Sequence, residues 1–450
     1  MNNSGSLSEK DGSLFLDLYE LTMAQSYLAN GMSANATFSL FVRPSEISRP
    51  YMVFAGLTEI INYISTFNFH QETIDYLNST NLFNKTFLAY LKTFRFTGTI
   101  RSMKEGALFF YNEPIMEIEA PIIEAQILET LIINLVHHQT LIATKAARCV
   151  FAANRKSLSD FSLRRSHGID AGMKSARSSF LVGFDTTSNV LAGKTYGIPI
   201  TGTMAHSYVS SFKNEIDAFR SYSKDNPNNT TLLIDTYDVI IGAKKAAAIG
   251  KEMEVTGQKL KAVRIDSGDL QFLSKAVREI LDTAKLNYVQ IIVSGGLDEY
   301  KVSDLVKAKS PIDGFGIGTR MGVSEDLPSI DMVYKLVNYD SRDINKSSEG
   351  KRYISGKKQV FRINDKNGNM NQDIIGSYNE PAPTKHATPL LTLQVDEGKI
   401  VVALPNLKQI RQSFIYDFST LETKYKLLEN PSTYPVNISD KLDMIQSSLQ

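Results

Sequence analysis

Between Ser157 and Met321 the sequence alternates short apolar runs with helical patterns, and this alternation constrains the fold more than any other feature. Seven runs recur, each ending in small or acidic residues: SLSDFS, SFLVGFD, IPITGTM, TLLIDTYD, AVRIDSGD, QIIVSGG and IDGFGIGTR. Residues 270–285 carry apolar side chains at helical spacing, as a helix that covers a buried strand requires. Strands that alternate with helices pair in parallel through right-handed crossovers. Seven such units predict an α/β fold and favour closure into a β/α barrel over residues 152–325, with an open sheet as the alternative.

The residues on either side of this region have different patterns. Residues 1–13 are small and polar, which predicts a flexible tail. Residues 14–151 mix helical and alternating patterns and end in a long apolar-periodic segment, which predicts an N-terminal α+β region with a long helix. Residues 326–450 contain strand patterns that lead into glycine-containing turns. We expect this C-terminal region to pack back on the N-terminal region in one α+β domain.

The composition excludes several classes of protein. Hydrophobic residues make up 42% of the chain and charged residues 22%, which argues against a largely disordered protein. The formal net charge of +1 gives no general attraction to nucleic acid or to an anionic membrane. A single cysteine excludes an internal disulfide framework and a cysteine-cluster zinc site. No segment has the apolar length of a signal peptide or a membrane span, so we expect a cytoplasmic protein.

Glycines follow the last two apolar runs of the predicted barrel. Gly295 and Gly296 follow the sixth run, and Gly318 follows the seventh, with Thr319 and Arg320 directly after it. The strand ends of a β/α barrel carry its active site, and the last loops often bind phosphate. Glycines let backbone N–H groups approach a phosphate closely, while the hydroxyl and the guanidinium add a donor and a cation. Glycines can also simply turn the chain, but two such motifs at adjacent strand ends favour a phosphate site.

Acidic residues follow the fourth and fifth runs. The two carboxylates Asp266 and Asp269, beside Ser267, could hold ribose hydroxyls or a magnesium ion that carries a diphosphate. Ser267 or Asp269 could instead cap the helix that follows. Asp235 and Asp238 allow the same two interpretations.

Aromatic, basic and imidazole side chains follow the first and third runs. Phe161 offers a face for a flat ring, and Arg164 offers a guanidinium for a carboxylate or phosphate, although surface salt bridging is the alternative. His206 could act as a base, a metal ligand or a covalent phosphate carrier, or could simply pack or cap a helix. His137 and His138 are adjacent in a predicted helix and point to different sides, so we expect them to be structural.

Taken together, these motifs resemble those of a known family. The segments LDLYELTMAQSY, SDFSLRRSHG, TSNVLAGKTYGIPITGTMAHSY, VRIDSGDL, VSGGLDEY and FGIGTRM occur in this order and resemble the nicotinate phosphoribosyltransferases. The resemblance implies an irregular β/α barrel like that of type II phosphoribosyltransferases. It implies transfer of the phosphoribosyl group from phosphoribosyl diphosphate to nicotinate for NAD synthesis, coupled to ATP hydrolysis, with Mg²⁺. It also implies a homodimer with shared active sites. Ser162 departs from the family, which more often has glycine there.

The resemblance also implies roles for individual residues. His206 corresponds to the histidine that becomes phosphorylated, and Asp266 is the second catalytic residue. Phe161 and Tyr19 would sandwich the pyridine ring, with Tyr19 contributed by the partner chain. The remaining nicotinate contacts would be Arg164, Thr203 and Arg264. The residues expected to bind phosphoribosyl diphosphate are Ser267, Gly295, Gly296, Gly318, Thr319 and Arg320. The metal ligands stay unassigned.

Three alternatives stay open at this point. A nicotinamide-specific enzyme is the nearest, but the loop Thr187-Ser188-Asn189 favours the acid, because an aspartate there would suit an amide and repel a carboxylate. A quinolinate phosphoribosyltransferase should need more cations for two carboxylates. A catalytically silent binding or regulatory subunit is the third, and the intact set of His206, Arg264 and Asp266 argues against it. The segment Gly350-Lys351-Arg352 has no assigned role.

Overall fold

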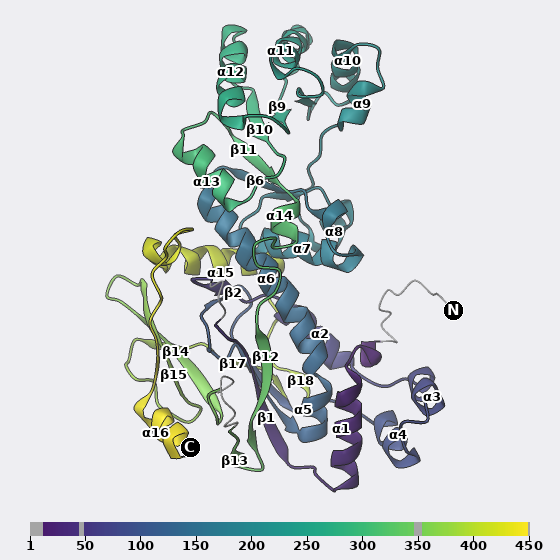
Figure 1. The fold of residues 1–450 in the computed structure, drawn as a ribbon, viewed down its shortest axis with the longest axis vertical. Helices are drawn as coiled ribbons and strands as arrows, with labels where there is room; N and C mark the ends of the chain where they lie inside the picture. The colour runs from purple at the N-terminus through teal and green to yellow at the C-terminus, as the bar shows by residue number, and fades with distance from the viewer. Residues whose placement is uncertain (1–11, 45–48, 346–352, 449–450) are drawn as a thin grey trace. The chain divides into compact units, whose positions relative to one another are not determined.

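A computed structural model describes residues 12–44, 49–345 and 353–448. Contacts divide the chain into two compact units, a first unit made of the residues up to Leu141 and from Ser329 onward, and a second unit of Ile142–Pro328 (Figure 1). Most of the predicted tail and the segment Gly350-Lys351-Arg352 lie outside the described residues. Within the described ranges, no helix has the length and apolar character needed to cross a membrane.

The second unit contains a parallel sheet in the order β7-β6-β11-β10-β9-β8. The strands are β6 (Ser157–Asp160), β7 (Thr186–Thr187), β8 (Thr231–Leu233), β9 (Ala262–Ile265), β10 (Gln290–Val293) and β11 (Gly314–Ile317). The first long strand, β6, pairs with the last, β11, so the sheet curls as a barrel does. The predicted irregular β/α barrel is confirmed, and its hydrogen-bonded part is a curled half-barrel.

Two of the predicted strands of this barrel were wrong in detail. The first residues of SFLVGFD end helix α7 (Ile169–Leu181), and the strand is the two-residue β7 further on. The C-terminal half of α7 is buried on all sides, and its last residues, Phe180 and Leu181, continue into Val182, which gives the short apolar run that also marks a buried strand. The run IPITGTM contributes only an isolated bridge between Ile200 and Thr187.

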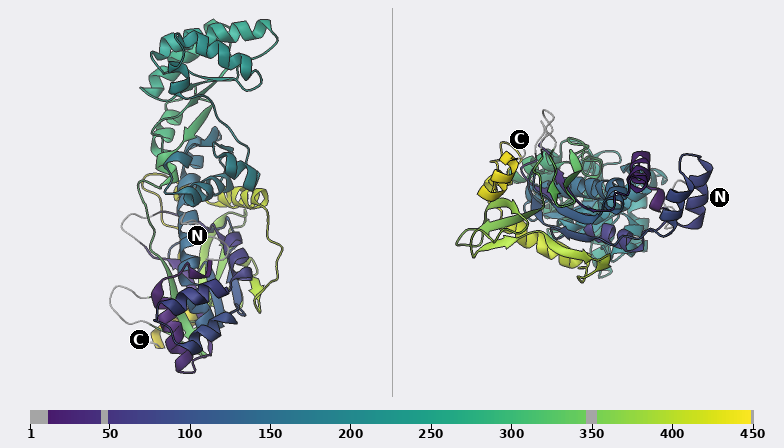
Figure 2. Two further views of the ribbon diagram at one scale, coloured as in Figure 1. Left: turned by 90° about the vertical axis from the view of Figure 1, so that its right-hand side faces the viewer. Right: turned by 90° about the horizontal axis from the view of Figure 1, so that it is seen from below.

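Helices surround the curled sheet. They are α7, α8 (Val190–Tyr196), α9 (His206–Ser210), α10 (Glu215–Asp225), α11 (Val239–Val255), α12 (Leu270–Thr283), α13 (Glu299–Lys307) and α14 (Thr319–Gly322), with a short 3-10 helix at Leu163–Arg165. Helix α12 confirms the helix predicted over 270–285. Helices α10, α11 and α12 lie side by side in Figures 1 and 2, and α11 and α12 contact β9 and β10 respectively.

The first unit is built on an antiparallel sheet in the order β13-β12-β1-β5-β3-β17-β18. Its strands are β1 (Asn35–Val42), β3 (Thr99–Ser102), β5 (Met116–Pro121), β12 (Met332–Tyr339), β13 (Arg342–Asp343), β17 (Thr392–Asp396) and β18 (Lys399–Ile400). Strand β1 pairs with β12, and β3 pairs with β17. The prediction that the C-terminal region packs back on the N-terminal region is therefore confirmed.

Two smaller sheets and several helices complete the first unit. The smaller sheets contain β14 (Lys358–Asn364), β15 (Met370–Ser377), β16 (Ala387–Pro389) and β19 (Val436–Ile438), and β2 (Met52–Val53) with β4 (Leu108–Phe109). The helices are α1 (Leu18–Ala29), α2 (Leu57–Thr66), α3 (Gln71–Ser79), α4 (Lys85–Lys92), α5 (Ile122–Ile127), α15 (Leu407–Thr420) and α16 (Asp440–Ser448). The predicted long helix is α6 (Glu129–Ala153), which continues from the first unit into the second.

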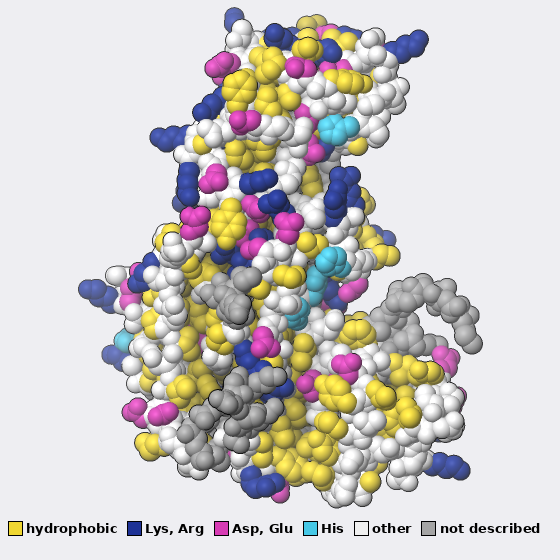
Figure 3. Space-filling view, in the orientation of Figure 1, with side chains coloured by type: hydrophobic (Ala, Val, Ile, Leu, Met, Phe, Trp, Pro, Cys, Tyr) yellow, Lys and Arg dark blue, Asp and Glu magenta, His cyan; other side chains and the backbone are white. Residues whose placement is uncertain are grey.

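One face of the protein shows charged side chains of both signs. On the face drawn in Figure 3, basic and acidic side chains are interspersed rather than gathered into one patch of a single sign. This distribution agrees with a net charge of +1. An anionic ligand is therefore expected to bind through the charges of a local site rather than through the overall field of the protein.

Candidate active site

Two cavities lie where the strands of the curled sheet end. The first, the histidine cavity, has a volume of about 380 Å³ and is lined by Phe161, Leu163, Arg164, Ser188, Gly202, Thr203, Met204, Ala205, His206, Arg264 and Asp266. The second, the glycine cavity, has a volume of about 360 Å³ and is lined by Phe161, Arg164, Arg165, Asp266, Ser294, Gly295, Gly296, Leu297, Gly316, Gly318, Thr319, Arg320 and Glu325. Phe161, Arg164 and Asp266 line both, so the two cavities adjoin.

Arg264, on β9, forms part of the wall of the histidine cavity. Its Nη1 donates to Thr203 Oγ1 at 2.8 Å and its Nη2 donates to the carbonyl oxygen of Met204 at 3.2 Å. Its Nε is buried and has no hydrogen-bond partner among the described residues. Burial lowers the pKa of Arg264, although Asp266 and Asp235 beside it act in the opposite direction. The guanidinium stays charged at neutral pH and has a donor left for an anionic group.

Asp266 lies between the ends of β9 and β10. Its carboxylate accepts a hydrogen bond from Ser294 Oγ, which follows β10. Its backbone N–H donates to Asp235 Oδ2 at 3.0 Å, and Ser267 Oγ donates to the same oxygen at 2.7 Å. Asp235 therefore supports the loop that carries Asp266, and Ser267 lines neither the histidine nor the glycine cavity.

The other two acids of these loops cap helices. Asp269 accepts from the backbone N–H of Phe272 at 3.0 Å and begins α12. Asp238 accepts from the backbone N–H of Ile241 at 2.8 Å and begins α11. Of the two interpretations that the sequence allows, capping therefore describes both residues.

Several positions in the glycine cavity leave no room for a side chain, because neighbouring strand ends pack closely against them. A Cβ on Gly295 would lie 1.8 Å from the carbonyl oxygen of Asp266, and the φ of Gly295 is +89°. A Cβ on Gly316 would lie 2.4 Å from the ring of Phe161, and one on Gly318 would lie 2.9 Å from the Phe161 carbonyl oxygen. The ring of Phe161 thus packs directly on the β11 backbone, between the two cavities.

His206 is the first residue of α9 and lines the histidine cavity. Its Nδ1 lies 3.2 Å from Thr236 Oγ1, the residue after Asp235. Within the described part of the chain its Nε2 has no hydrogen-bond partner. The imidazole therefore has a ring nitrogen available for chemistry beside Arg264 and Thr203.

Thr319 and Arg320 line the glycine cavity, but the guanidinium already has partners. Arg320 Nη1 pairs with Asp298 Oδ2 at 2.5 Å and Nε pairs with Glu325 Oε2 at 3.1 Å. The hydrogen bond to Asp298 raises the pKa of Arg320. Arg164 and Arg165, by contrast, form no ion pair with any described residue, and both are exposed.

Comparison with known proteins identifies the family. The N-terminal domain of nicotinate phosphoribosyltransferase (NAPRTase) matches residues 14–137, the nicotinate phosphoribosyltransferase (NAPRTase) family matches residues 156–371, and the C-terminal domain matches residues 384–446. Nicotinate phosphoribosyltransferase pncB2 of Mycobacterium tuberculosis (strain ATCC 25618 / H37Rv) is 42% identical over 435 residues, which cover 96% of this chain and 92% of that protein. The chain belongs to the nicotinate phosphoribosyltransferase family.

Two further comparisons agree with this family. The nicotinate phosphoribosyltransferase of Bacillus subtilis (strain 168) is 36% identical over 464 residues, covering 96% of this chain and 94% of that protein. The crystal structure of human nicotinic acid phosphoribosyltransferase matches with a TM-score of 0.87 and 27% identity, covering 96% of this chain and 99% of that one. A nicotinate-nucleotide pyrophosphorylase from Pyrococcus furiosus, at 23% identity and a TM-score of 0.76, shares the fold.

Ser162, which departs from the glycine more frequent in the nicotinate phosphoribosyltransferases, is accommodated without strain. Its φ of −82° needs no glycine. Its Oγ and backbone N–H donate to Asp160 Oδ1 at 2.6 and 2.9 Å. A Cβ on Gly322 would lie 2.3 Å from Ser162 Cβ, so the missing side chain at Gly322 makes room for the serine.

Tyr19 belongs to a different compact unit from the other predicted site residues. It lies on α1 in the first unit and its side chain is 44% exposed, whereas both cavities lie in the second unit. Burial and the nearby Glu129 raise its pKa. Next to it, burial raises the pKa of Glu20 to about 7, although Glu20 Oε1 accepts a hydrogen bond from the Thr130 N–H at 3.0 Å.

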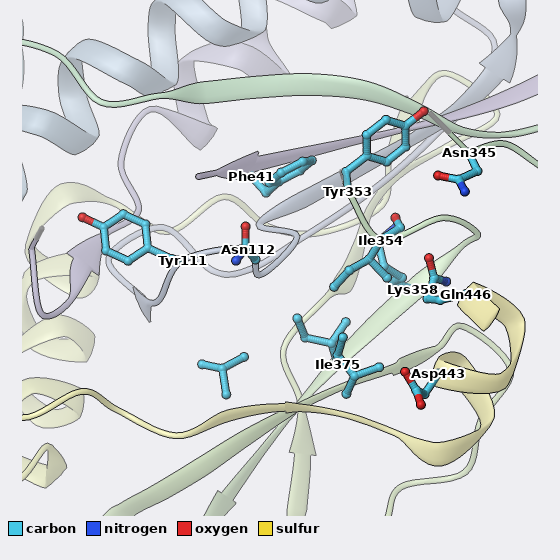
Figure 4. Close-up of a pocket in the computed structure, with 12 residues that line it drawn as sticks. Phe41, Tyr111, Asn112, Asn345, Tyr353, Ile354, Lys358, Ile375, Asp443 and Gln446 are labelled. Atoms are coloured by element: carbon cyan, nitrogen blue, oxygen red, sulfur yellow. The ribbon is translucent and has the colours of Figure 1, made fainter. Parts of the chain in front are cut away.

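The first unit has a cavity of its own, with a volume of about 420 Å³ (Figure 4). Its lining includes Phe41 and Tyr353, whose rings lie above Ile375 in the view of Figure 4. None of the predicted site residues of this nicotinate phosphoribosyltransferase family member lines it.

Some supporting residues were not predicted from the sequence. Thr236 supports His206, and Asp298 and Glu325 bind Arg320. Thr236 and Asp298 come shortly after strand ends, where site residues are expected, whereas no signal in the sequence points to Glu325. The prediction for His137 is confirmed: its Nε2 accepts from the backbone N–H of Ile330 at 3.1 Å, and burial lowers its pKa.

Proposed function

We propose that the protein transfers the phosphoribosyl group of phosphoribosyl diphosphate to nicotinate, coupled to ATP hydrolysis through a phosphorylated His206. The products are nicotinate mononucleotide and diphosphate, an early step of NAD synthesis. The observation that carries the proposal is the pair of adjoining cavities that share Phe161, Arg164 and Asp266. One cavity suits a flat anion and the other suits a phosphate, so the shared residues lie where the two substrates would meet.

The histidine cavity takes nicotinate in this proposal. The ring of Phe161 offers a face to the pyridine, and Arg264 or Arg164 meets its carboxylate. As the pyridine nitrogen attacks C1 of the ribosyl group, the ring becomes a pyridinium, which an aromatic face favours by about 0.5 to 2 kcal/mol. The loop residue Ser188 lines this cavity without a carboxylate, which favours nicotinate over nicotinamide.

The glycine cavity takes the phosphoribosyl group. Backbone N–H groups at Gly295, Gly296 and Gly318 and the hydroxyl of Thr319 would bind its phosphate. C1 gains positive charge as diphosphate departs, so the main electrostatic need is to hold the departing anion.

The residues fit a magnesium ion that arrives with the substrate. Asp266 lines both cavities, and Oδ1 of the neighbouring Asp235 is buried without a hydrogen-bond partner in the described chain. The described residues contain no group of three or more His, Cys, Asp or Glu side chains suited to a metal, so most ligands would come from the diphosphate and water. When bound, Mg²⁺ neutralises charge on the departing diphosphate.

His206 supplies the link to ATP. A lone pair on a ring nitrogen attacks the γ-phosphorus, an N–P bond forms, and the P–O bond to ADP breaks with its electron pair leaving on ADP. Water later removes the phosphoryl group as phosphate. Formation of the glycosidic bond needs no general base, since the pyridine nitrogen carries no proton to remove. A covalent carrier is therefore a better role for His206 than proton transfer.

A homodimer with Tyr19 acting in the partner's site belongs to the same proposal. Large apolar side chains are exposed at Ile169 (82%), Val190 (68%), Leu191 (53%) and Ile200 (57%). Helix α8 packs closely on Ile200, since a Cβ on Gly193 would lie 2.3 Å from Ile200 Cγ2, so Ile200 lies beside the helix that carries Val190 and Leu191. Exposed apolar groups that gather in this way are typical of an interface.

One assay tests the reaction and one tests the coupling. Formation of nicotinate mononucleotide is measured with and without ATP, with nicotinamide in parallel. We expect nicotinate to be used, nicotinamide to be rejected, and ATP to raise the rate. Incubation with γ-labelled ATP should give an acid-labile, base-stable phosphoenzyme that is lost in His206→Asn. Label that persists in His206→Asn, or no label in the wild type during turnover, would remove His206 from this role.

A further inference from the structure

The two loops of the glycine cavity are joined by an aspartate with two roles. The first loop, Ser294–Leu297, follows β10, and the second loop, Gly318–Thr319, follows β11. Asp298 comes directly after the first loop, and its Oδ1 accepts from the backbone N–H of Lys301 at 2.9 Å and so caps α13. Its Oδ2 pairs with Arg320, which comes directly after the second loop. One side chain therefore begins a helix and ties the two loops together.

Arg320 lies between two carboxylates rather than facing the cavity freely. Besides Asp298, its Nε binds Glu325 Oε2 at 3.1 Å. The Asp298 side chain is 12% exposed and that of Glu325 is 56% exposed. The pair with Asp298 is thus the better shielded from water, and a shielded charge pair is stronger than an exposed one.

A second cation joins the two acids that come directly after Asp298 and Glu325 in the sequence. Lys145 of α6 lies between Glu299 and Asp326, with Nζ 2.6 Å from Glu299 Oε2 and 2.7 Å from Asp326 Oδ1. Arg148, one turn further along α6, also binds Glu299, at 2.8 Å. The side chains of Lys145 and Glu299 are 2% and 0% exposed. The adjacent acids 298–299 and the adjacent acids 325–326 are therefore joined by two cations, of which Arg320 is half-buried and Lys145 is buried.

We propose that these four acids, with Arg320 and Lys145, form a double clamp that sets the separation of the two glycine loops. Arg320 is then a positioning residue for phosphoribosyl diphosphate, not a ligand of its phosphate. A guanidinium bound to two carboxylates has little net charge to offer an anion. Backbone N–H groups on two separate loops, however, bind one phosphate only when the loops are held at the right distance. This inference rests on the proposed placement of the phosphate in the glycine cavity.

Asp298→Asn separates the two roles of this residue. The amide oxygen still caps α13, because asparagine is as good a cap as aspartate, but the neutral side chain no longer pairs with Arg320. We expect the KM for phosphoribosyl diphosphate to rise about tenfold and the KM for nicotinate to change less than about twofold. Asp282→Asn is the matched control, because it removes a pair between an exposed aspartate and Arg278 on α12. An unchanged KM for phosphoribosyl diphosphate in Asp298→Asn would overturn the clamp.

Arg320→Gln and the double variant distinguish positioning from direct binding. Both single substitutions remove the same ion pair between Asp298 and Arg320. The KM of the double variant for phosphoribosyl diphosphate should therefore be no higher than that of the more strongly affected single variant. If Arg320 bound the phosphate itself, Arg320→Gln would raise the KM more than Asp298→Asn, and the two losses would multiply. That result would overturn the positioning role.

Hydrogen exchange tests the clamp without any substrate. In Asp298→Asn, the backbone amides of both glycine loops should exchange faster than in the wild type, while those of β8 keep their rate. Unchanged exchange in both loops would overturn the proposal. A wild type that forms no nicotinate mononucleotide would instead contradict the proposed function, and the exchange result would still decide whether the clamp exists.

Discussion

At the scale of single residues, the site depends on side chains that are already held in place before a substrate arrives. Arg264 is fixed by Thr203 and by the backbone at Met204, and Asp266 is fixed from β8 through Asp235 and from β10 through Ser294. Groups that need no rearrangement at the moment of reaction stabilise developing charge most effectively. Substitutions here should therefore change substrate binding more than the stability of the fold.

Arg264→Ala should weaken nicotinate binding tenfold or more. A charge-assisted hydrogen bond to a carboxylate contributes roughly 1.5 to 3 kcal/mol, and 1.4 kcal/mol corresponds to tenfold. The apparent affinity for nicotinate is measured by steady-state kinetics at saturating phosphoribosyl diphosphate. Arg220→Ala is the control, because it removes an exposed arginine paired with Glu252. An affinity within about twofold of the wild type would contradict the role of Arg264.

Gly318→Ala should weaken the binding of phosphoribosyl diphosphate about tenfold or more. The new methyl group would lie 2.9 Å from the Phe161 carbonyl oxygen and would force the ends of β6 and β11 apart. The KM for each substrate reports this, and the KM for nicotinate should rise less. Gly12→Ala is the matched control, because its Cβ would meet only the Tyr63 ring, at 3.7 Å. Equal effects of the two substitutions would argue against a phosphate on the Gly318 backbone.

At the scale of elements, the sequence predicts where strands end better than it predicts very short strands or buried helix ends. The runs that became β6, β9, β10 and β11 have apolar residues bounded by turn residues, and these local signals are strong. The end of α7 was missed because its C-terminal half is buried on all sides and the apolar run at its end resembles a strand. The residues around Arg320 were missed for another reason. Arg320 meets Asp298 and Glu325 only in the folded chain, and no local sequence pattern predicts such ion pairs.

Helix α1 should make the stability of the protein depend on pH through Glu20. Burial raises the pKa of Glu20 to about 7 in the folded state, whereas an exposed glutamate titrates near 4.5. The folded state therefore holds the proton more tightly, and the stability contributed by protonation is present below about pH 4.5 and lost as the pH rises towards 7. Glu20→Gln keeps an oxygen acceptor for Thr130, so the free energy of unfolding should fall less between pH 5 and pH 8.

Urea denaturation at several pH values measures this effect of Glu20. Glu279→Gln, at an exposed position on α12, is the control and should leave the pH dependence as in the wild type. Parallel pH profiles for Glu20→Gln and the wild type would show that Glu20 titrates normally in the folded chain.

At the scale of the whole molecule, the two compact units contribute different residues to the proposed site. Tyr19 belongs to the first unit and His206 to the second. The family resemblance predicted Tyr19 from a motif, but no local pattern says which copy of the chain it serves. Only an experiment on mixed dimers separates a contribution in the same chain from one in the partner.

Mixing inactive Tyr19→Ala with inactive His206→Asn should restore activity. In a mixed dimer, one of the two sites receives both an intact tyrosine and an intact histidine if Tyr19 acts in the partner. Differently tagged subunits are exchanged, the mixed dimer is purified, and its rate of nicotinate mononucleotide formation is compared with that of each parent. Mixed dimers that form but stay as inactive as their parents would show that Tyr19 does not act in the partner's site.

The pairing of β1 with β12 has a consequence for how the chain is made. Ala36 pairs with Tyr339, so the ribosome must add the whole second unit before this edge of β1 meets its partner. At about 5 to 20 residues per second, the edge waits roughly 15 to 60 s during synthesis. An open apolar strand edge is a place where chains aggregate. The second unit is one continuous stretch and can fold in the meantime, whereas this edge of β1 stays without its partner strand until β12 has been made.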